Sequence, residues 1–286
     1  MNSFPLLFTQ KNYVTFPFYR NNAPLLDSPL CGMSVKTAGS MRFRWHETNK
    51  NRDEFLRKLT DASKLLPKAV ELVHSKNVYD LKNGNESLGM QGDGLITTNR
   101  CFLPVVTVAD CMPLFLYDSK SSVFGVVHSG WKGTGIVGEA IKLACKNYGA
   151  RAEDFSIVIG PHIKSCCYIV NEERAKYFCD NFGCDCVTEL ETGGVCFAGG
   201  RGLSVTWDNG AGKLYRLNLE KANLNVLFTA GVREENIARC TDCTCCNESL
   251  GSNRRETADF TLKNPNATKE QLSRCFTVQT AFVGWL

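Results

Sequence analysis

Three short apolar runs follow one another between residues 92 and 131, and they constrain the fold more than any other feature of the sequence. The runs are rich in β-branched residues, and glycine, proline or polar residues separate them: GDGLITTN (92–99), LPVVTVADCMPLFLYD (103–118) and SSVFGVVHSGW (121–131). This pattern is typical of consecutive buried strands. Because no helix separates the runs, the chain lacks the regular strand–helix alternation of a Rossmann sheet. We therefore expect an α+β fold.

Helical spacing of apolar residues occurs in four other segments. In three of them a glycine, which favours the left-handed backbone that ends a helix, follows the apolar repeat. The predicted helices are residues 51–68, 132–150, 171–183 and 212–232, and further strands are predicted at residues 69–81, 156–161 and 275–286. Neither a linker nor an internal repeat separates these segments. We therefore expect a single domain over residues 1–286, built from layered mixed sheets and helices.

The composition limits the class of partner. Of the 286 residues, 43% are hydrophobic and 22% are charged, which is typical of a folded globular protein. A net charge of +4 is too small for a chain whose main partner is nucleic acid. No basic segment precedes an apolar run at the N-terminus, and no window approaches 18 apolar residues. We therefore expect no signal peptide, no membrane span and a cytoplasmic protein, whose oligomeric state stays open.

Cysteine is unusually frequent, with 15 residues in the chain. The odd count, the size of the chain and the missing signal peptide favour a reduced protein with thiol or metal chemistry over a disulfide scaffold. Several cysteines are grouped: Cys166 with Cys167, Cys179 with Cys184 and Cys186, and Cys240, Cys243, Cys245 and Cys246. The last group, CTDCTCC, contains a metal-like C-x-x-C, but no second C-x-x-C follows at zinc-ribbon spacing. We therefore expect buried or redox-active thiols there.

Polar residues interrupt three apolar segments of the predicted sheets: His74 in LVHS, Asp110 and Cys111 in VADCM, and His128 in VVHSG. Polar groups in such segments need partners or serve a site. One cysteine and two histidines form a three-ligand set that leaves a fourth zinc position open for water or substrate. The same residues also allow Cys111 to act as a nucleophile with His128 as its base. The spacing does not separate these two interpretations.

Copper is a third possibility, because two histidines and a cysteine with a weak axial methionine form a blue-copper site, and Met112 adjoins Cys111. The ligands would come from separate segments of a mixed chain, which favours zinc over copper. A trinuclear copper cluster needs more imidazoles than the four histidines of this sequence. We therefore expect zinc, with copper as the alternative.

Two basic motifs suit an anion. HSGWKGTG is a glycine-rich turn before a predicted helix, where backbone N–H groups and Lys132 could hold phosphate. SNRRE contributes Arg254 and Arg255, whose guanidinium groups match phosphate through paired hydrogen bonds; the alternative is a solvated surface pair. Asp110, beside Cys111, is a candidate to orient a histidine or to protonate a leaving base.

Five motifs, in this order, resemble the YfiH-type family: GDGLIT, ADCMPLFLYD, GVVHSGWKGTG, VIGPHIKSCCYIV and SNRRE. Members of this family are called polyphenol oxidases or laccase-domain proteins and, more recently, purine nucleoside phosphorylases. The resemblance covers roughly residues 30–286. It implies a zinc site made by His74, Cys111 and His128, and a layered α+β fold related to the deamidase domain of cytotoxic necrotising toxins.

The resemblance also implies an enzyme that cleaves adenosine, inosine and methylthioadenosine with phosphate to a free base and ribose 1-phosphate, and that also deaminates adenosine. Purine nucleoside and phosphate are then the expected partners, and Cys111, His128 and Asp110 the expected catalytic residues. Three alternatives stay open. They are a cysteine hydrolase or amidase that uses Cys111 and His128 without a metal, a copper-dependent polyphenol oxidase, and a thiol-rich metal-binding or redox protein.

Overall fold

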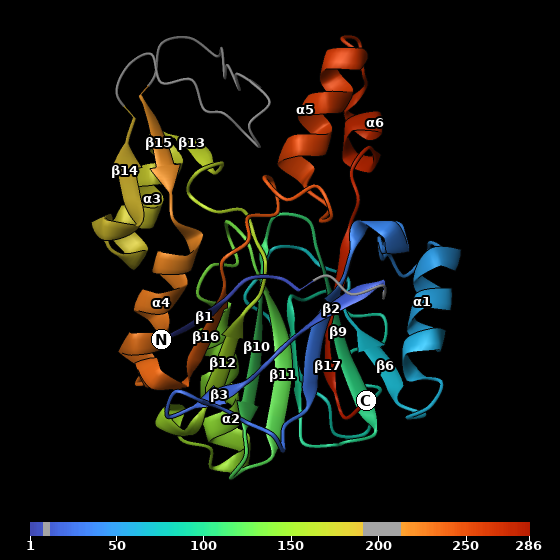
Figure 1. The fold of residues 1–286 in the computed structure, drawn as a ribbon, viewed down its shortest axis with the longest axis vertical. Coiled ribbons are helices and arrows are strands. Elements are labelled where there is room, and N and C mark those ends of the chain that lie inside the picture. Colours follow the sequence, from blue (N-terminus) through green and yellow to red (C-terminus); the bar gives the residue numbers. More distant parts are fainter. Residues whose placement is uncertain (8–11, 191–212) are drawn as a thin grey trace.

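Two large sheets and two small ones form the β structure of the computed structural model, which describes residues 1–7, 12–190 and 213–286 (Figure 1). The seven-stranded sheet has the order β1 (Asn2–Phe4), β16 (Ile237–Cys240), β12 (Ser156–Ile159), β10 (Met112–Asp118), β11 (Val123–Ser129), β8 (Gly94–Thr97) and β7 (Val78–Asp80). The five-stranded sheet has the order β2 (Tyr13–Phe16), β5 (Leu30–Ser34), β17 (Gln279–Gly284), β9 (Phe102–Val108) and β6 (Leu66–Ala69). The small sheets are β13 (Ile169–Asn171), β15 (Leu214–Leu217) and β14 (Val187–Glu189), and β3 (Tyr19–Arg20) with β4 (Ala23–Pro24). Both large sheets mix parallel and antiparallel pairs, which confirms the expected mixed fold.

The two large sheets pack face to face, because alternate side chains of their strands enter different cores. In β10, Leu114 and Leu116 enter the core beneath the helices, whereas Phe115 and Tyr117 enter the core between the sheets. Helices α2 (Ile136–Tyr148) and α4 (Leu219–Ala230) cover the outer face of the seven-stranded sheet, and α3 (Glu172–Phe182) packs against α4. Helix α1 (Lys50–Thr60) covers the five-stranded sheet. The layers are therefore helix, sheet, sheet and helix.

Helices α5 (Asn253–Lys263) and α6 (Lys269–Arg274) project beyond the sheets as a lobe of their own (red in Figure 1). None of their residues is fully buried. Ser252 caps α5 by accepting the N–H of Arg255, so the SNRRE motif marks a helix start that the sequence analysis does not assign. Across the described residues, no helix combines the length and the apolar character needed to span a membrane.

Two predicted helices are shorter in the structure, because each adjoins a strand. Helix α1 ends at Thr60 rather than at residue 68: Lys64 has a left-handed φ of 58°, and Pro67 disfavours helical backbone at the residue before it. In the segment predicted as a helix over residues 212–232, β15 precedes α4, and residue 212 lies outside the described ranges. Asn218 begins α4 by accepting the N–H of Lys221. The predicted glycines end the helices as expected: Gly149, Gly183 and Gly231.

Two predicted strands are divided in the structure at the residues that carry candidate chemistry. Residues 103–118 form β9 and β10, which belong to different sheets, and Asp110 turns the chain between them with a φ of 76°. Residues 69–81 contain only the last residue of β6 and the whole of β7, and His74 lies in the loop between them with a φ of 60°. A run of apolar residues predicts strand content, but it does not show where the chain crosses from one sheet to the other.

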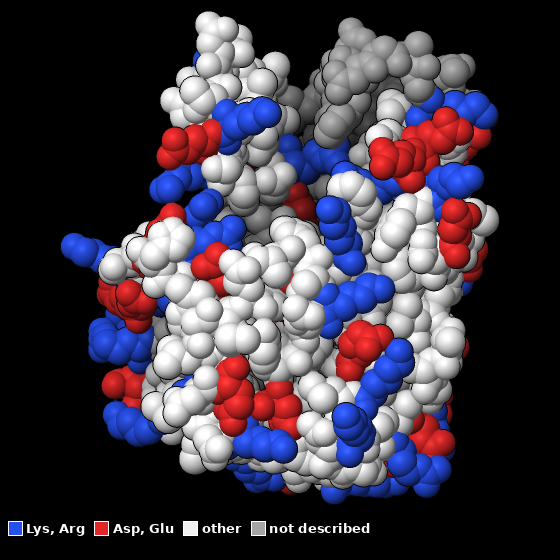
Figure 2. All heavy atoms as spheres, turned by 180° about the vertical axis from the view of Figure 1, so that it is seen from behind, with Lys and Arg blue, Asp and Glu red and all other residues white. Residues whose placement is uncertain are grey.

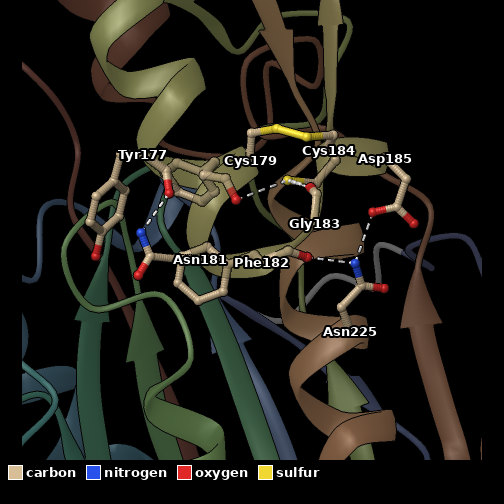
Figure 3. Close-up of a disulfide and its surroundings, with 10 residues drawn as sticks. Tyr177, Cys179, Asn181, Phe182, Gly183, Cys184, Asp185 and Asn225 are labelled. Carbon is tan, nitrogen blue, oxygen red and sulfur yellow. Dashed lines mark hydrogen bonds between the residues drawn. A yellow bond between two sulfur atoms is a disulfide. The ribbon is translucent and has the colours of Figure 1, made fainter.

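One pair of cysteines is joined in the structure. Cys179 of α3 and Cys184 of the 3-10 helix η3 (Cys184–Cys186) form a disulfide (Figure 3). The turn at Gly183, with a φ of 98°, brings their Cα atoms to 4.0 Å, and Asn225 of α4 holds this turn by donating to the Phe182 carbonyl. This bond departs from the expectation of a reduced protein. The 12 other cysteines of the described residues are free, so this part of the chain is not a disulfide scaffold.

Candidate active site

The three predicted metal ligands meet at one edge of the seven-stranded sheet. Met112 of β10 pairs with Ser129 of β11, so the start of β10 lies beside the end of β11. Cys111 and His128 are therefore neighbours, although 17 residues separate them in the chain. The loop before β7 brings Nε2 of His74 to 4.0 Å from Sγ of Cys111. The three ligand atoms all lie within 4.8 Å of one another.

Asp93, at the start of β8, fixes both histidines. This carboxylate is fully buried, and its Oδ1 lies 2.9 Å from Nδ1 of His128 and accepts the backbone N–H of His74 at 3.0 Å. Its Oδ2 accepts the backbone N–H and the hydroxyl of Ser75 at 2.5 and 2.7 Å. Because Nδ1 of His128 is occupied, Nε2 of this ring is left for the thiol of Cys111. A carboxylate that orients an imidazole in this way is typical of metal-binding histidines.

The three side chains fit around a single tetrahedral ion. Two imidazoles and one thiolate are a donor set of catalytic zinc sites, in which the fourth position stays open. Gly130, which follows β11, leaves room for the ligands: a Cβ there would lie 2.8 Å from Cys111 Sγ and 3.1 Å from Cδ2 of His74. A larger residue at position 130 would therefore displace the ligands. Both the donor set and the space fit a mononuclear metal.

The charges of this group favour the thiolate of Cys111. Burial opposes its ionisation, but the adjacent His128 and His74 outweigh burial and lower the pKa of Cys111 from 9.0 to about 6. Burial also opposes the charged form of His128, yet Cys111 and Asp93 raise the pKa of His128 from 6.5 to about 10. The metal-free group therefore holds a thiolate beside an imidazolium at neutral pH. A metal that takes both ligands must displace the imidazolium proton.

Replacing Asp93 by asparagine is expected to weaken metal binding, with zinc as the probe, by about 10- to 100-fold. The amide NH₂ of asparagine does not accept hydrogen bonds. The variant therefore loses some of the hydrogen bonds that orient His128 and the loop of His74. Competition with a chromogenic chelator measures the zinc affinity, and circular dichroism checks the fold. Asp80→Asn is the matched control. It removes a carboxylate that accepts hydrogen bonds from Asn147 and Tyr148. Equal zinc affinity in the two variants would contradict the role given to Asp93.

The three ligands lie in the wall of a pocket of about 410 Å³. Four arginines line the same pocket: Arg42, Arg44, Arg174 and Arg254. Aromatic surface comes from three further side chains: Trp131, Tyr168 and Phe276. Seen from behind in Figure 2, basic side chains gather around the hollow beneath the lobe of α5 and α6. Such a pocket suits a small anion together with an aromatic ring.

The predicted phosphate residues separate in the structure. Arg254 lines the pocket, and its Nη2 donates to the Ile169 carbonyl at 3.1 Å. Arg255 instead holds the loop before α5 by donating to backbone carbonyls of that loop: those of Thr244, Cys245, Asn247 and Leu250. Lys132 is exposed, with its Nζ 5.6 Å from the centroid of the Trp131 ring. Arg255 and Lys132 are therefore not among the residues that line this pocket, and phosphate contacts by these two side chains stay a prediction.

Asp110 lines the pocket, but its carboxylate serves the start of α5. Its Oδ1 accepts the hydroxyl of Thr244 and its Oδ2 the backbone N–H of Arg254, both at 2.6 Å. Burial raises the pKa of Asp110 even though these bonds favour its charged form. The group that orients His128 is therefore Asp93, whereas Asp110 positions the backbone of Arg254.

Four charged residues of this site are not identified by the sequence analysis: Asp93, Arg42, Arg44 and Arg174. The sequence does contain a sign of Asp93, because an acidic residue between two glycines at the start of a buried strand needs hydrogen-bond partners. Arg42 and Arg44 alternate in MRFRW, a pattern that exposed charges show as well. Arg174 is one of several charged residues of α3, and only its position 3.8 Å over the Trp131 ring identifies it. The local sequence could not separate these arginines from surface charges.

The fold is shared with solved structures. The crystal structure of the hypothetical protein YfiH from Bacillus licheniformis matches with a TM-score of 0.70 and 21% identity over 94% of this chain and 99% of that chain. YlmD from Geobacillus stearothermophilus matches with the same TM-score and identity over 98% of both chains. These likenesses confirm the mixed fold related to YfiH.

Several curated relatives carry the name purine nucleoside phosphorylase. A Clostridium acetobutylicum protein is 40% identical over 107 residues, which are 37% of this chain and 44% of that protein. The relative from Borreliella burgdorferi is 29% identical over 189 residues, which are 66% of this chain and 73% of that protein. YlmD of Bacillus subtilis is 33% identical over 171 residues, or 57% of this chain and 54% of that protein. The matches with the first and third relatives thus span about half of those proteins.

A family model matches most of the chain. The matched residues are 44–261, which include His74, Asp93, Cys111, His128 and Arg254. The chain therefore belongs to the family described as multi-copper polyphenol oxidoreductase laccase.

Proposed function

We propose that the protein is a purine nucleoside phosphorylase, the name that its relatives carry, and that its activity depends on zinc. The proposal is carried by one observation: the Cys111 and histidine ligand set and four arginines line the same pocket. Phosphorolysis needs an anion site beside a site for a ring system, and this pocket offers both. The proposed substrates are phosphate and adenosine, inosine or methylthioadenosine, and the products are the free base and ribose 1-phosphate.

The arginines are held in place by the protein itself, which supports a role in binding phosphate. Arg42 donates to the Ser273 carbonyl at 2.9 Å, and Arg254 donates to the Ile169 carbonyl at 3.1 Å. The guanidinium of Arg174 stacks on Trp131. A guanidinium held by such contacts loses little freedom when it binds an anion and presents its N–H groups in pairs. We therefore place phosphate among these arginines.

The aromatic side chains of the pocket suit the purine. Trp131 and Phe276 line it from different parts of the chain, and Tyr168 adds a third ring. Aromatic rings stack on one another at centroid distances of about 4.5–7 Å, and such pairs add about 0.5–1.5 kcal/mol beyond the buried area. A base that stacks here would hold its ribose between the aromatic wall and the arginines.

In the proposed reaction a phosphate oxygen attacks C1′ of the ribose while the bond from C1′ to the purine breaks. The purine leaves with the bonding electrons and takes up a proton. The arginines orient phosphate and stabilise charge, and the aromatic wall positions the purine, so both reactants are held together. Asp93 keeps His128 directed at Cys111. His128, Cys111 and His74 would hold zinc. When bound, zinc supplies Lewis-acid charge stabilisation and activates water.

Adenosine deamination is the proposed accompanying reaction. Water replaces phosphate as the nucleophile, attacks C6 of the adenine ring, and ammonia leaves. Because His128 would be a zinc ligand, the residue of the pocket wall proposed to move a proton in this step is Asp110. Protonation of a leaving group by Asp110 would require its carboxyl to exchange the bonds to Thr244 and Arg254 described above.

Two other functions have specific support. A metal-free cysteine hydrolase or amidase is favoured by the low pKa of Cys111 and its hydrogen bond with His128. Copper-dependent polyphenol oxidation is favoured by the description of the family. Because the whole sequence holds four histidines, copper could occupy the three-ligand set only as a single ion.

Adenine release from adenosine is expected to rise with phosphate concentration until it saturates, with ribose 1-phosphate as the second product. The expectation follows from phosphate as the nucleophile, because each base released then consumes one phosphate. Chromatography of the products of the purified protein measures both compounds. Base release that ignores phosphate and yields free ribose would indicate a hydrolase. Oxidation of phenols by the copper-loaded protein without base release would indicate a polyphenol oxidase.

A further inference from the structure

A second group of potential ligands consists only of cysteines. Cys166 and Cys167 follow β12, and Cys243 and Cys246 follow β16. Strands β12 and β16 are parallel neighbours, so the loops that follow them leave the same edge of the sheet. A parallel bridge between His162 and Cys243 continues this pairing into the loops. The fold therefore brings together two pairs of cysteines that lie far apart in the sequence.

The spacing of the four sulfur atoms matches a single tetrahedral ion. Four thiolates about 2.3 Å from one zinc ion lie about 3.8 Å from each other at tetrahedral angles. Sγ of Cys166 lies 3.7 Å from Sγ of Cys167 and 3.8 Å from Sγ of Cys246. Sγ of Cys167 lies 3.3 Å from Sγ of Cys246, and all four atoms, Cys243 included, lie within 4.8 Å of one another. These separations exceed the 2.05 Å of a disulfide, and a multi-iron cluster would need ligands further apart.

Hydrogen-bond donors and cationic side chains lie beside this group of cysteines. The backbone N–H of Lys164 donates to Sγ of Cys243 at 3.3 Å. The guanidinium of Arg216 donates to the carbonyl of Cys166 at 3.2 Å, and that of Arg255 donates to the carbonyl of Cys245 at 2.9 Å. Four thiolates around a divalent ion carry a net charge of about −2, which these donors and cations offset.

We propose that Cys166, Cys167, Cys243 and Cys246 bind one zinc ion in a structural site, separate from the set of His74, Cys111 and His128. Four protein ligands fill the coordination sphere, which is the arrangement of structural rather than catalytic zinc. Each thiol releases its proton to solvent as it binds. Nothing in this site depends on the proposed phosphorylase activity.

The site joins the two loops that frame the pocket. The loop after β12 carries Ile163 and Tyr168 of the pocket wall. The loop after β16 carries Thr244, which holds Asp110, and leads into α5 with Arg254. A zinc ion at the cysteine site therefore fixes the relative position of these two walls.

Metal analysis of the full chain, purified under reducing conditions with zinc present, tests the proposal. We expect two zinc ions per chain, one in each site. Cys246→Ser and Cys166→Ser change exposed ligands with little risk to the fold, and each is expected to keep one zinc. Cys111→Ala is also expected to keep one zinc, that of the four-cysteine site. Cys101→Ser, which changes an exposed cysteine outside both sites, is the matched control and is expected to keep two.

Cobalt substitution identifies the ligands directly. Co²⁺ bound to four thiolates gives a strong sulfur-to-metal charge-transfer absorption, which is expected to persist in Cys111→Ala and to weaken in Cys246→Ser. Zinc is also expected to protect Cys166 and Cys246 from alkylation. A wild-type chain that binds only one zinc, lost in Cys111→Ala and kept in Cys246→Ser, would overturn the proposal. A disulfide between Cys167 and Cys246 in the zinc-treated protein would also overturn it, in favour of a redox pair.

Discussion

Replacing Cys111 by alanine is expected to reduce the rate of phosphorolysis by about 100- to 1000-fold while the fold is kept. The change removes the one thiolate of the three-ligand set and leaves His74 and His128, which are too few to hold zinc in place. A bound metal contributes several kcal/mol of charge stabilisation in a transition state, and each 1.4 kcal/mol corresponds to a factor of ten. Adenine release at saturating phosphate measures the effect.

A cysteine outside the site provides the control for this experiment. Cys275→Ala changes a half-buried thiol of the α6 region and is expected to keep activity and zinc. Metal analysis of the same samples separates the two candidate roles of Cys111. If the wild-type protein is fully active without metal and Cys111→Ala is inactive, Cys111 is a nucleophile and the zinc proposal fails. If Cys111→Ala keeps full activity, both roles fail.

Replacing Arg254 by lysine is expected to raise the KM for phosphate by about 10- to 150-fold. Lysine keeps the positive charge but loses the paired N–H groups that match phosphate oxygens, and a hydrogen bond to a charged group contributes about 1.5–3 kcal/mol. Steady-state kinetics with phosphate as the varied substrate measures the change. Thermal stability is expected to fall little, because the backbone N–H of Arg254 still donates to Asp110.

The neighbouring substitution should have the opposite profile. Arg255→Lys removes several donors to the carbonyls of the loop before α5 and is expected to cost roughly 2–4 kcal/mol of stability, a fall in Tm of roughly 3–7 °C. The KM for phosphate of the folded variant is expected to stay within a few-fold of the wild-type value. If Arg255→Lys raises this KM and Arg254→Lys does not, phosphate binds at Arg255 and not in the pocket.

The sequence predicted the parts of the protein that depend on local chemistry. Residues 92–131 are rich in β-branched residues, and they form β8, β9, β10 and β11. Glycines end α2, α3 and α4, because their backbone adopts conformations that other residues avoid. The set of His74, Cys111 and His128 was also predictable, since these are chemically distinct residues within apolar segments of a sequence that has four histidines.

Only the tertiary structure decided which other residues join them. Arg254 and Arg255 are adjacent, but successive residues of a helix point about 100° apart, so one lines the pocket and the other binds the loop. Asp93 reaches His128 because β8 and β11 are paired. The four clustered cysteines meet because β12 and β16 are parallel neighbours. Strand pairing and helix facing depend on contacts between distant segments, and a local pattern of residues holds no information about those contacts.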